Sequence, residues 1–571
     1  MATTMTLRLN APGMTALHKA GLAGLYMTLQ AFDETEQAIE GLQWQLESQQ
    51  VVLTWTENTP KAAFERLIKK SFWIDEKGFI RLAGLEPERE MSYAQRHHLY
   101  NSLLNSFLQY GKHREKAANK ATLTYDVGDG KIHWLKDFEP ITAFMHRKIA
   151  TDPKVAKDWI DGKGYFKKEV GLIGWLYPGG STKHSDSSLK NDTTIREPFE
   201  AALTLLYAPV GTIYYLINSR EKGRKARLAL LIPTIRDLEE YSDIRRVIAS
   251  QDSLDLTASS ASDALLRMLL TIRTGKTLGE IEERVRFRKE HTSKTGAETQ
   301  RPSSIVSSFV CRVITFGIVK WNEKQKTRTH TYTIFTGDLP GLENYRLAAA
   351  IFKNRHQKIN ATLNRRGEIT QPERHFVTTF SSRELIADNI AHNRAWYHGI
   401  ADYAIRRDTT AKDPSEQLVS RLVHFERKEL GRMVKEAEFE NELESLFINA
   451  CHKSWQQRLG QLGERARTEN LGDEGFRHLR EREAERLRTS LARCKNAETL
   501  RETVVGFWSR GGSNEYLQGR GLAQVLPLFE GSSWRKAKDL TLLSLISYQT
   551  PDRLSDVSPE PTSNSEGDDE K

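Results

Sequence analysis

Cysteine is scarce in this chain, which has three thiols among its 571 residues, at Cys311, Cys451 and Cys494. An odd number of widely spaced cysteines without a C-x-x-C pair predicts neither a disulfide framework nor a zinc site. No other pattern in the sequence indicates a prosthetic group. We therefore expect a reducing compartment, no bound metal and no cofactor.

Long hydrophobic runs are also missing. The uncharged stretch that comes nearest to membrane-spanning length, residues 201–219, is divided by Pro209 and Gly211. Its second half, from Thr212 to Ser219, is rich in β-branched and aromatic residues, which favours a buried strand over a transmembrane helix. Because the N-terminus lacks a charged segment followed by an apolar core, we expect a cytoplasmic protein with no membrane partner.

Enzyme signatures are lacking as well. Thr274-Gly275-Lys276-Thr277 resembles the end of a phosphate-binding loop, but Leu270 occupies the position of its first glycine. The chain has no H-E-x-x-H motif and no His-Asp doublet, and His97-His98 has no acidic neighbour. We predict a non-catalytic protein. Carboxylates distant in sequence can still converge on metal ions, so a metal-dependent nuclease that processes nucleic acid stays an alternative.

Positive charge, by contrast, is in excess. The formal net charge is +9, and the last 21 residues hold seven acids against Arg553 and Lys571, so residues 1–550 carry +14. Such an excess in a soluble chain favours a polyanionic partner, usually nucleic acid. The acidic segment 551–571, rich in proline and serine, is typical of a disordered tail.

The hydrophobic pattern divides the rest of the chain into three regions and predicts an α+β fold. Residues 1–150 alternate strand-like and helix-like segments, as in a mixed α/β domain. Residues 151–380 show mainly β signal, with hairpins, and are a candidate nucleic-acid-binding region. From residue 381 to 550 the 3.6-residue period predicts an antiparallel helical bundle, with helices at 383–405, 415–467, 474–495, 497–509 and 534–548.

The most distinctive stretch runs from Leu7 to Thr28, LRLNAPGMTALHKAGLAGLYMT. A short apolar strand ends at the turn Asn10-Ala11-Pro12-Gly13, and Thr15 is placed to cap a helix that contains Gly21 and Gly24. Each glycine costs a helix roughly 1 kcal/mol relative to alanine. We therefore predict that another backbone packs closely against that helix face.

This stretch, together with the chain length and the helical C-terminal third, resembles the large subunit of a type I CRISPR surveillance complex (Cascade), in the Myxan-like branch close to type I-B. The resemblance implies a prokaryotic, non-catalytic protein of CRISPR defence or RNA-guided transposition. Such a subunit reads a protospacer-adjacent motif (PAM) in duplex DNA and helps to form the R-loop, in which guide RNA pairs with the target strand.

The resemblance also implies partners. They are the guide RNA with the backbone and small subunits of the ribonucleoprotein, the double-stranded target DNA, the displaced non-target strand, and a recruited nuclease-helicase or transposition machinery. In type I-B relatives the bundle is also made separately from an internal start, for which Met433 is a candidate here. A structural RNA-binding protein with no DNA role stays a further alternative.

Two predicted β-hairpins carry basic connections. Strands at 212–219 and 226–232 flank the first, and strands at 305–321 and 328–335 flank the second. Compact loops with several cations suit phosphates or a minor groove, although such charges also discourage edge aggregation. The predicted backbone contacts are Arg220, Lys222, Arg224 and Lys225 in the first hairpin and Lys324, Lys326 and Arg328 in the second.

Two further basic clusters are candidates for contacts with the nucleic-acid backbone. Arg284, Arg286 and Arg288 alternate along the chain, which places them on one face if the segment is extended. A similar patch nearer the N-terminal motif consists of Lys112, Arg114 and Lys116.

The segment from Gly171 to His184 is the predicted reader of base edges. Its paired glycines let the backbone approach a groove closely, and Trp175 and Tyr177 are placed to stack or to anchor the loop. The alternative is a flexible connection held by a buried tryptophan. The predicted PAM-reading residues are Gly179, Gly180, Ser181, Thr182, Lys183 and His184.

Cations also recur at helical spacing in the C-terminal region. One stripe consists of Arg421, His424, Lys428, Arg432 and Lys435. It has no evident acidic partners, and we predict that Arg421, Lys428 and Arg432 hold a displaced strand or the backbone of the heteroduplex. A second stripe, Arg482, Arg486 and Arg493, is interpreted as a solvated face with pairs such as Glu483 with Arg486.

Overall fold

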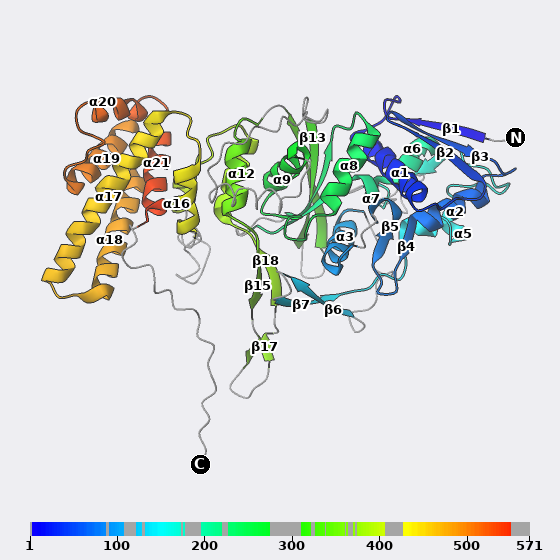
Figure 1. Ribbon diagram of the computed structural model, residues 1–571, viewed down its shortest axis with the longest axis horizontal. Helices are drawn as coiled ribbons and strands as arrows, with labels where there is room; N and C mark the ends of the chain where they lie inside the picture. The colour runs from blue at the N-terminus through cyan, green and yellow to red at the C-terminus, as the bar shows by residue number, and fades with distance from the viewer. Residues whose placement is uncertain are drawn as a thin grey trace, which may run out of the picture. The chain divides into compact units, whose positions relative to one another are not determined.

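The computed structural model describes residues 3–86, 91–107, 121–127, 132–172, 175–177, 196–219, 226–274, 310–320, 326–336, 339–359, 361–363, 369–371, 374–405 and 426–549. The chain divides into two compact units (Figure 1), unit 1 from Met1 to Trp396 and unit 2 from Tyr397 to Lys571. Unit 1 mixes helices with strands and unit 2 is helical where it is described, which confirms the predicted α+β class. The predicted domain boundaries at residues 150, 380 and 550 stay predictions.

The N-terminal motif forms the predicted strand, turn and helix. Strand β1 (Thr3–Arg8) precedes helix α1 (Ala16–Glu34), and the Thr15 hydroxyl accepts a hydrogen bond from the His18 amide as the helix cap. A Cβ atom added at Gly24 would lie 2.2 Å from the carbonyl oxygen of Tyr207, and one at Gly21 would lie 1.9 Å from that of Thr204. The predicted close backbone approach is therefore confirmed.

Residues 201–219 supply the other side of that contact. Helix α6 (Phe199–Leu206), helix α7 (Ala208–Gly211) and strand β10 (Ile213–Ile217) follow one another, as Pro209 and Gly211 predicted. A Cβ atom at Gly211 would lie 1.7 Å from the carbonyl oxygen of Ala20, so both chain segments need glycine. Among the residues that the structure describes, no helix has the length and apolar character needed to cross a bilayer.

A three-stranded antiparallel sheet in the order β1-β3-β2 packs on an aromatic cluster in the N-terminal part of unit 1. Trp55, Phe64, Trp159 and Phe199 are buried there, and Phe166 stacks on Phe199. The elements of this part are β2 (Leu42–Glu47), β3 (Gln50–Trp55), α2 (Lys61–Ser71), β4 (Phe72–Ile74), β5 (Ile80–Leu82), the 3₁₀ helix η1 (Ala83–Leu85), α3 (Tyr93–Ser106), β6 (Ala121–Val127), β7 (Ile132–Phe138), α4 (Met145–Lys148), α5 (Pro153–Ala156), β8 (Glu169–Gly171) and β9 (Arg196–Pro198).

A second sheet has five strands in the order β12-β10-β11-β13-β14. Helices α3 and α9 pack against it, and α8 packs against α1 and α9 (Figure 1). Helices α8 and α12 were not predicted from the sequence. The elements are β11 (Ala226–Pro233), α8 (Leu238–Ala249), β12 (Thr257–Ala258), α9 (Ala261–Thr274), β13 (Val310–Lys320), β14 (Lys326–Thr336), α12 (Leu342–Ile351), β15 (Arg355–Ile359), β16 (Thr362–Leu363), β17 (Ile369–Gln371), β18 (Arg374–Thr378) and α13 (Ser381–Ala391).

The described part of the predicted C-terminal helices is present, with two differences. The segment predicted as one helix over 383–405 holds α13 and α14 (Ile400–Ile405), separated by residues 392–399, where Asn393 has a φ of 54°. The segment predicted as a single helix over 415–467 holds α16 and α17, separated by residues 437–441, because the Asn441 side chain accepts from the Glu444 amide and starts a new helix. The elements of unit 2 are α14 (Ile400–Ile405), α16 (Arg427–Glu436), α17 (Glu442–Thr468), α18 (Gly472–Arg493), α19 (Ala497–Gly511), α20 (Gly521–Val525), the 3₁₀ helix η4 (Leu526–Phe529) and α21 (Trp534–Ser547).

Candidate nucleic-acid interface

The two predicted hairpins belong to one sheet, and their connections leave it at the same end. Strand β10 pairs with β11, so Ile217 lies at the end of the sheet where β11 begins at Ala226. Ala226 in turn faces Gly317, and β13 runs on from there to Lys320, which faces Lys326 across the second hairpin. The strand ends that lead into the basic segment 220–225 and into segment 321–325, which is flanked by Lys320 and Lys326, therefore lie together.

Most of the hairpin residues predicted to contact nucleic acid belong to these connections. The backbone of Lys326 and Arg328 lies in β14, opposite Lys320 and Ile318. The remaining predicted hairpin contacts lie outside the residues that the structure describes: Arg220, Lys222, Arg224, Lys225 and Lys324.

A third hairpin, which the sequence interpretation missed, is fastened to the same end. Strands β15 and β18 pair, and β16 pairs with β17 in the part of the hairpin between them. The Asn218 side chain, just before segment 220–225, donates to the Val377 carbonyl, and the Thr379 hydroxyl donates back to the Asn218 carbonyl. The sequence between β16 and β17 is Asn-Arg-Arg-Gly-Glu, residues 364–368, so this connection is also basic.

A buried ionic network anchors the root of this hairpin. The Asp263 carboxylate, at the start of α9, accepts from Arg383 Nη2 at 3.0 Å and from the Ser259 amide at 2.7 Å. Arg383, on α13, also donates to the Asn354 side chain at 2.7 Å, immediately before β15. Burial alone raises the pKa of the Asp263 carboxyl, but Arg383 and Arg267 hold this pKa below its ordinary value. The network thus ties the third hairpin to the sheet.

Glu384, the residue after Arg383 on α13, holds the first hairpin. Ser219, which precedes the basic segment 220–225, donates to both carboxylate oxygens of Glu384 at 2.9 and 2.8 Å. Since Arg383 and Glu384 are adjacent, one helix start fixes the roots of two hairpins. Figure 1 shows β15 and β18 close to β7, and β7 contacts β18.

Other predicted site residues lie outside the described part of the chain, while the anchor of the glycine-rich loop lies within it. Trp175 is fully buried and packs edge-on against His146, with ring centroids 5.2 Å apart. Trp175 is therefore an anchor and is not exposed for stacking on a base. The predicted residues outside the described ranges are Gly179, Gly180, Ser181, Thr182, Lys183, His184, Lys112, Arg114, Lys116, Arg284, Arg286 and Arg288.

The basic stripe in unit 2 needs a correction. On α16, Lys428, Arg432 and Lys435 are exposed while Leu430 and Met433 are buried, as predicted. The expectation that this stripe has no acidic partner is wrong, because Arg432 Nε lies 3.8 Å from the Glu436 carboxylate one turn along the helix. Arg421 and His424 lie outside the described residues.

The second stripe also differs in its pairing. Glu483 pairs with Arg458 of α17 at 3.0 Å, not with Arg486 as predicted. Arg482, Arg486 and Arg493 are exposed on α18. Glu483 therefore holds two helices together, and three cations stay on the surface of unit 2.

No group of histidine, cysteine and carboxylate side chains suited to hold a metal ion occurs among the described residues. Cys311, Cys451 and Cys494 are buried and form no disulfide. His97 and His98 are buried in α3, and burial lowers the pKa of His98 to about 4. These groups are part of the packed interior.

Comparison with known proteins identifies the family. The model of the DevT N-terminal domain matches residues 6–206, and the model of the DevT C-terminal domain matches residues 435–571, which together make up more than half of the chain. The chain belongs to the DevT family. The first match contains the whole of α1 and α6, so it includes the contact between Gly21 and Thr204 described above.

This chain is also similar to the CRISPR-associated protein Cas8a1/Csx13 of Myxococcus xanthus (strain DK1622). The two chains are 26% identical over 95% of this chain and 88% of the relative. The resemblance to the large subunit of a type I CRISPR complex, noted from residues 7–28, is thereby confirmed. The C-terminal match begins two residues after Met433, and an internal start at Met433 stays a prediction.

Proposed function

We propose that this chain is the non-catalytic large subunit of a guide-RNA ribonucleoprotein of the Cascade type, which recognises the PAM in duplex DNA and stabilises the R-loop. The observation that carries the proposal is that three hairpins with basic sequences, at 220–225, 320–328 and 364–368, have their roots at one end of the five-stranded sheet of unit 1. One isolated basic turn is ordinary, but three basic hairpins rooted together, two of them fixed by Arg383 and Glu384 of α13, are suited to binding phosphates.

In this proposal the hairpins capture duplex DNA and the loop at residues 179–184 inspects the base pairs beside the target. Phosphate contacts provide affinity without sequence information, so the reading of the PAM needs side chains or backbone amides at base edges. The exposed cations on α16 then hold the displaced strand while guide RNA pairs with the target. Cleavage or integration belongs to a recruited nuclease-helicase or transposition machinery.

The test is binding of guide-matched duplex by the complex assembled with the neighbouring gene products, at fixed salt, while the flanking base pairs are varied. We expect binding to depend on the flank only when this subunit is present. Flank-independent binding, or Mg²⁺-dependent cleavage by the isolated chain, would contradict the proposal, the latter in favour of a nuclease.

The hairpins are tested by removing four cations at once. We expect the substitutions Arg220→Gln, Lys222→Gln, Arg224→Gln and Lys225→Gln to weaken duplex binding and to reduce the slope of log K against log salt by about 0.9 for each lost phosphate contact. The matched control is Lys157→Gln, Lys163→Gln, Lys167→Gln and Lys168→Gln, which removes the same charge from exposed positions elsewhere in unit 1. Equal effects of the two variants would show a general charge effect only.

A further inference from the structure

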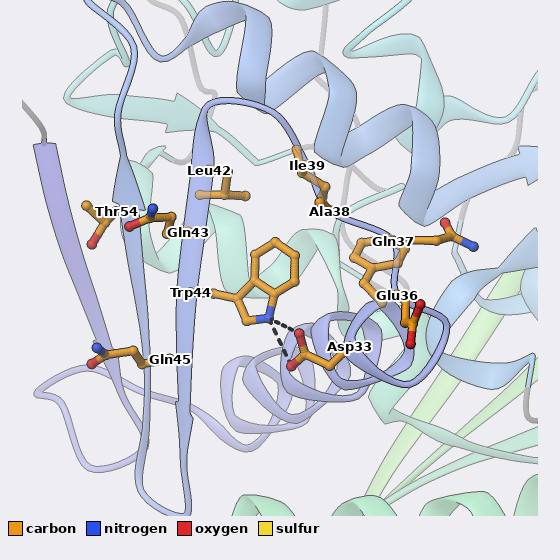
Figure 2. A pocket seen from close by; sticks show the side chains of 11 residues that line it. Asp33, Glu36, Gln37, Ala38, Ile39, Leu42, Gln43, Trp44, Gln45 and Thr54 are labelled. Atoms are coloured by element: carbon orange, nitrogen blue, oxygen red, sulfur yellow. Dashed lines mark hydrogen bonds between the residues drawn. The ribbon is translucent and has the colours of Figure 1, made fainter.

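A pocket beside the three-stranded sheet differs in charge from the basic end of unit 1. It has a volume of about 590 Å³ and lies between β2 and the loop that follows α1 (Figure 2). Among the described residues its lining contains no lysine, arginine or histidine, and includes Phe32, Asp33, Glu36, Ile39, Leu42 and Trp44. The pocket thus joins two carboxylates to an aromatic wall in a chain of net charge +9.

The Asp33 carboxylate is held by a neutral group. It accepts from the indole nitrogen of Trp44, which lies 3.1 Å from each carboxylate oxygen, and Figure 2 shows the indole directed at this group. An indole N–H is a neutral donor, so it orients the carboxylate without neutralising it. Glu34 next to it is compensated by Arg246 of α8 at 2.7 Å, whereas Glu36 is exposed in the loop.

The end of α1 strengthens this negative potential. The helix ends at Glu34 without a basic residue in its last turn, and the carbonyl end of a helix carries partial negative charge. Trp44 is half-buried, and its ring lies 6.4 Å from the ring of Phe32. The exposed part of an indole beside two carboxylates is a favourable environment for a guanidinium or ammonium group.

Strand β2 adds a place for a polypeptide backbone. It is the last strand in the order β1-β3-β2, and among the described strands it pairs with β3 alone. In an antiparallel pair every second residue directs its amide and carbonyl away from the partner. The Leu42 amide donates to the Ile39 carbonyl at 3.1 Å, so the outer edge of β2 offers hydrogen-bonding groups to an added strand from Trp44 onward. The pocket and this edge are adjacent, because Trp44 belongs to both.

We propose that this pocket is a protein-docking site, which takes an arginine or lysine side chain from an extended segment of another subunit. The cation lies against Trp44 and pairs with Asp33 and Glu36, while the segment runs along β2. Nucleic acid is the wrong occupant, because its phosphates are repelled by both carboxylates. The inference rests on assembly with protein subunits and does not depend on PAM reading.

The first test is the affinity of this subunit for the complex assembled without it, measured by titration at two salt concentrations. We expect the double variant Asp33→Asn and Glu36→Gln to bind at least about tenfold more weakly at low salt. The asparagine amide introduced by Asp33→Asn keeps an oxygen that can accept from Trp44, so the variant removes charge and leaves the local hydrogen bond possible. Trp44→Ala is expected to weaken binding further than Trp44→Phe.

The matched control is the double variant Asp158→Asn and Glu76→Gln, which makes the same change in net charge at exposed positions outside the pocket. An affinity of the pocket variant within about twofold of this control would overturn the proposal. Thermal unfolding of each variant, compared with the natural chain, separates loss of binding from loss of fold.

The second test identifies what occupies the pocket. A photoreactive benzoylphenylalanine is placed at Gln43, an exposed lining position on β2, and the assembled complex is irradiated and digested. We expect a cross-link to a protein peptide that contains arginine or lysine. Cross-links to RNA or DNA, or none above a matched position at Asp158, would refute the proposal. The titration and the cross-link report docking of this subunit, whereas the assay with varied flanking base pairs reports PAM reading. Failure of the docking proposal is therefore distinguishable from failure of the proposed function.

Discussion

Units 1 and 2 place their charged side chains differently. In unit 1, Asp263, Arg267 and Arg383 are almost completely buried and bond to residues from several distant segments. In unit 2 many ion pairs join residues three or four positions apart on an exposed helix face, such as Arg465 with Glu469 at 2.7 Å. The buried network makes the hairpin roots depend on contacts distant in sequence, whereas unit 2 combines such local pairs with pairs between helices, such as Arg458 with Glu483.

Removing one buried charge should sharpen this contrast most. Asp263→Asn leaves Arg383 without a carboxylate in the interior, and breaking a buried pair costs about 3–5 kcal/mol. Glu469→Gln in unit 2 breaks an exposed pair and should cost less than about 0.5 kcal/mol. Chemical denaturation monitored by hydrogen exchange in each unit measures the loss in free energy of unfolding for both variants. A cost below about 1 kcal/mol for Asp263→Asn would show that the network is not the anchor.

Acidification should affect the units unequally. Burial lowers the pKa of His98 to about 4 in unit 1. A histidine whose folded pKa is depressed takes up protons more readily in the unfolded state, so its unit loses stability as pH falls from 6.5 towards 4, by about 1.4 kcal/mol per pH unit at most. In unit 2 the lowered pKa of His452, about 4, acts in the same direction, but burial raises the pKa of Asp539 to about 6. The folded state then holds the Asp539 proton more tightly, which adds stability over the same fall in pH and offsets His452.

The pH difference is measured by hydrogen exchange of the full chain between pH 6.5 and 4.5, with His98→Gln as the control variant. Glutamine retains a donor for the Tyr214 carbonyl, which His98 approaches at 3.3 Å, but does not titrate. The variant should reduce the pH dependence of unit 1 without abolishing it, because burial also lowers the pKa of His146, to about 3. Equal slopes in the natural chain and the variant would show that His98 is not responsible.

Alanine substitutions at glycines should have opposite signs in the two units. Gly24→Ala in α1 forces a Cβ against the Tyr207 carbonyl, and overpacking of this kind costs about 1–3 kcal/mol. At Gly460 in α17 nothing lies within 4 Å of an added Cβ, so alanine should stabilise unit 2 by about 0.5–1 kcal/mol through helix propensity. Thermal unfolding of both variants decides this, and a stabilising Gly24→Ala would contradict the close backbone contact.

Local patterns were sufficient for much of the secondary structure. Thr15 and the paired glycines predicted the cap and the close contact of α1. Apolar runs predicted the strands of the first basic hairpin, and alternation predicted the last strand of the second. The third hairpin was missed because its strands are short and contain histidine, arginine and glutamine among few apolar residues. The pairing of Glu483 with Arg458 was missed because it joins two helices, and helical spacing reports only neighbours on one helix.

By itself the sequence determined the elements, the excess of positive charge and the family resemblance at residues 7–28, because these depend on residue type and short spacing. Only the tertiary structure decided that the roots of three basic hairpins lie at one end of the five-stranded sheet, and that Asp33, Glu36 and Trp44 line one pocket. Strand order, register and buried ion pairs arise from contacts between residues far apart in the chain, and these carry no periodic signature in the sequence.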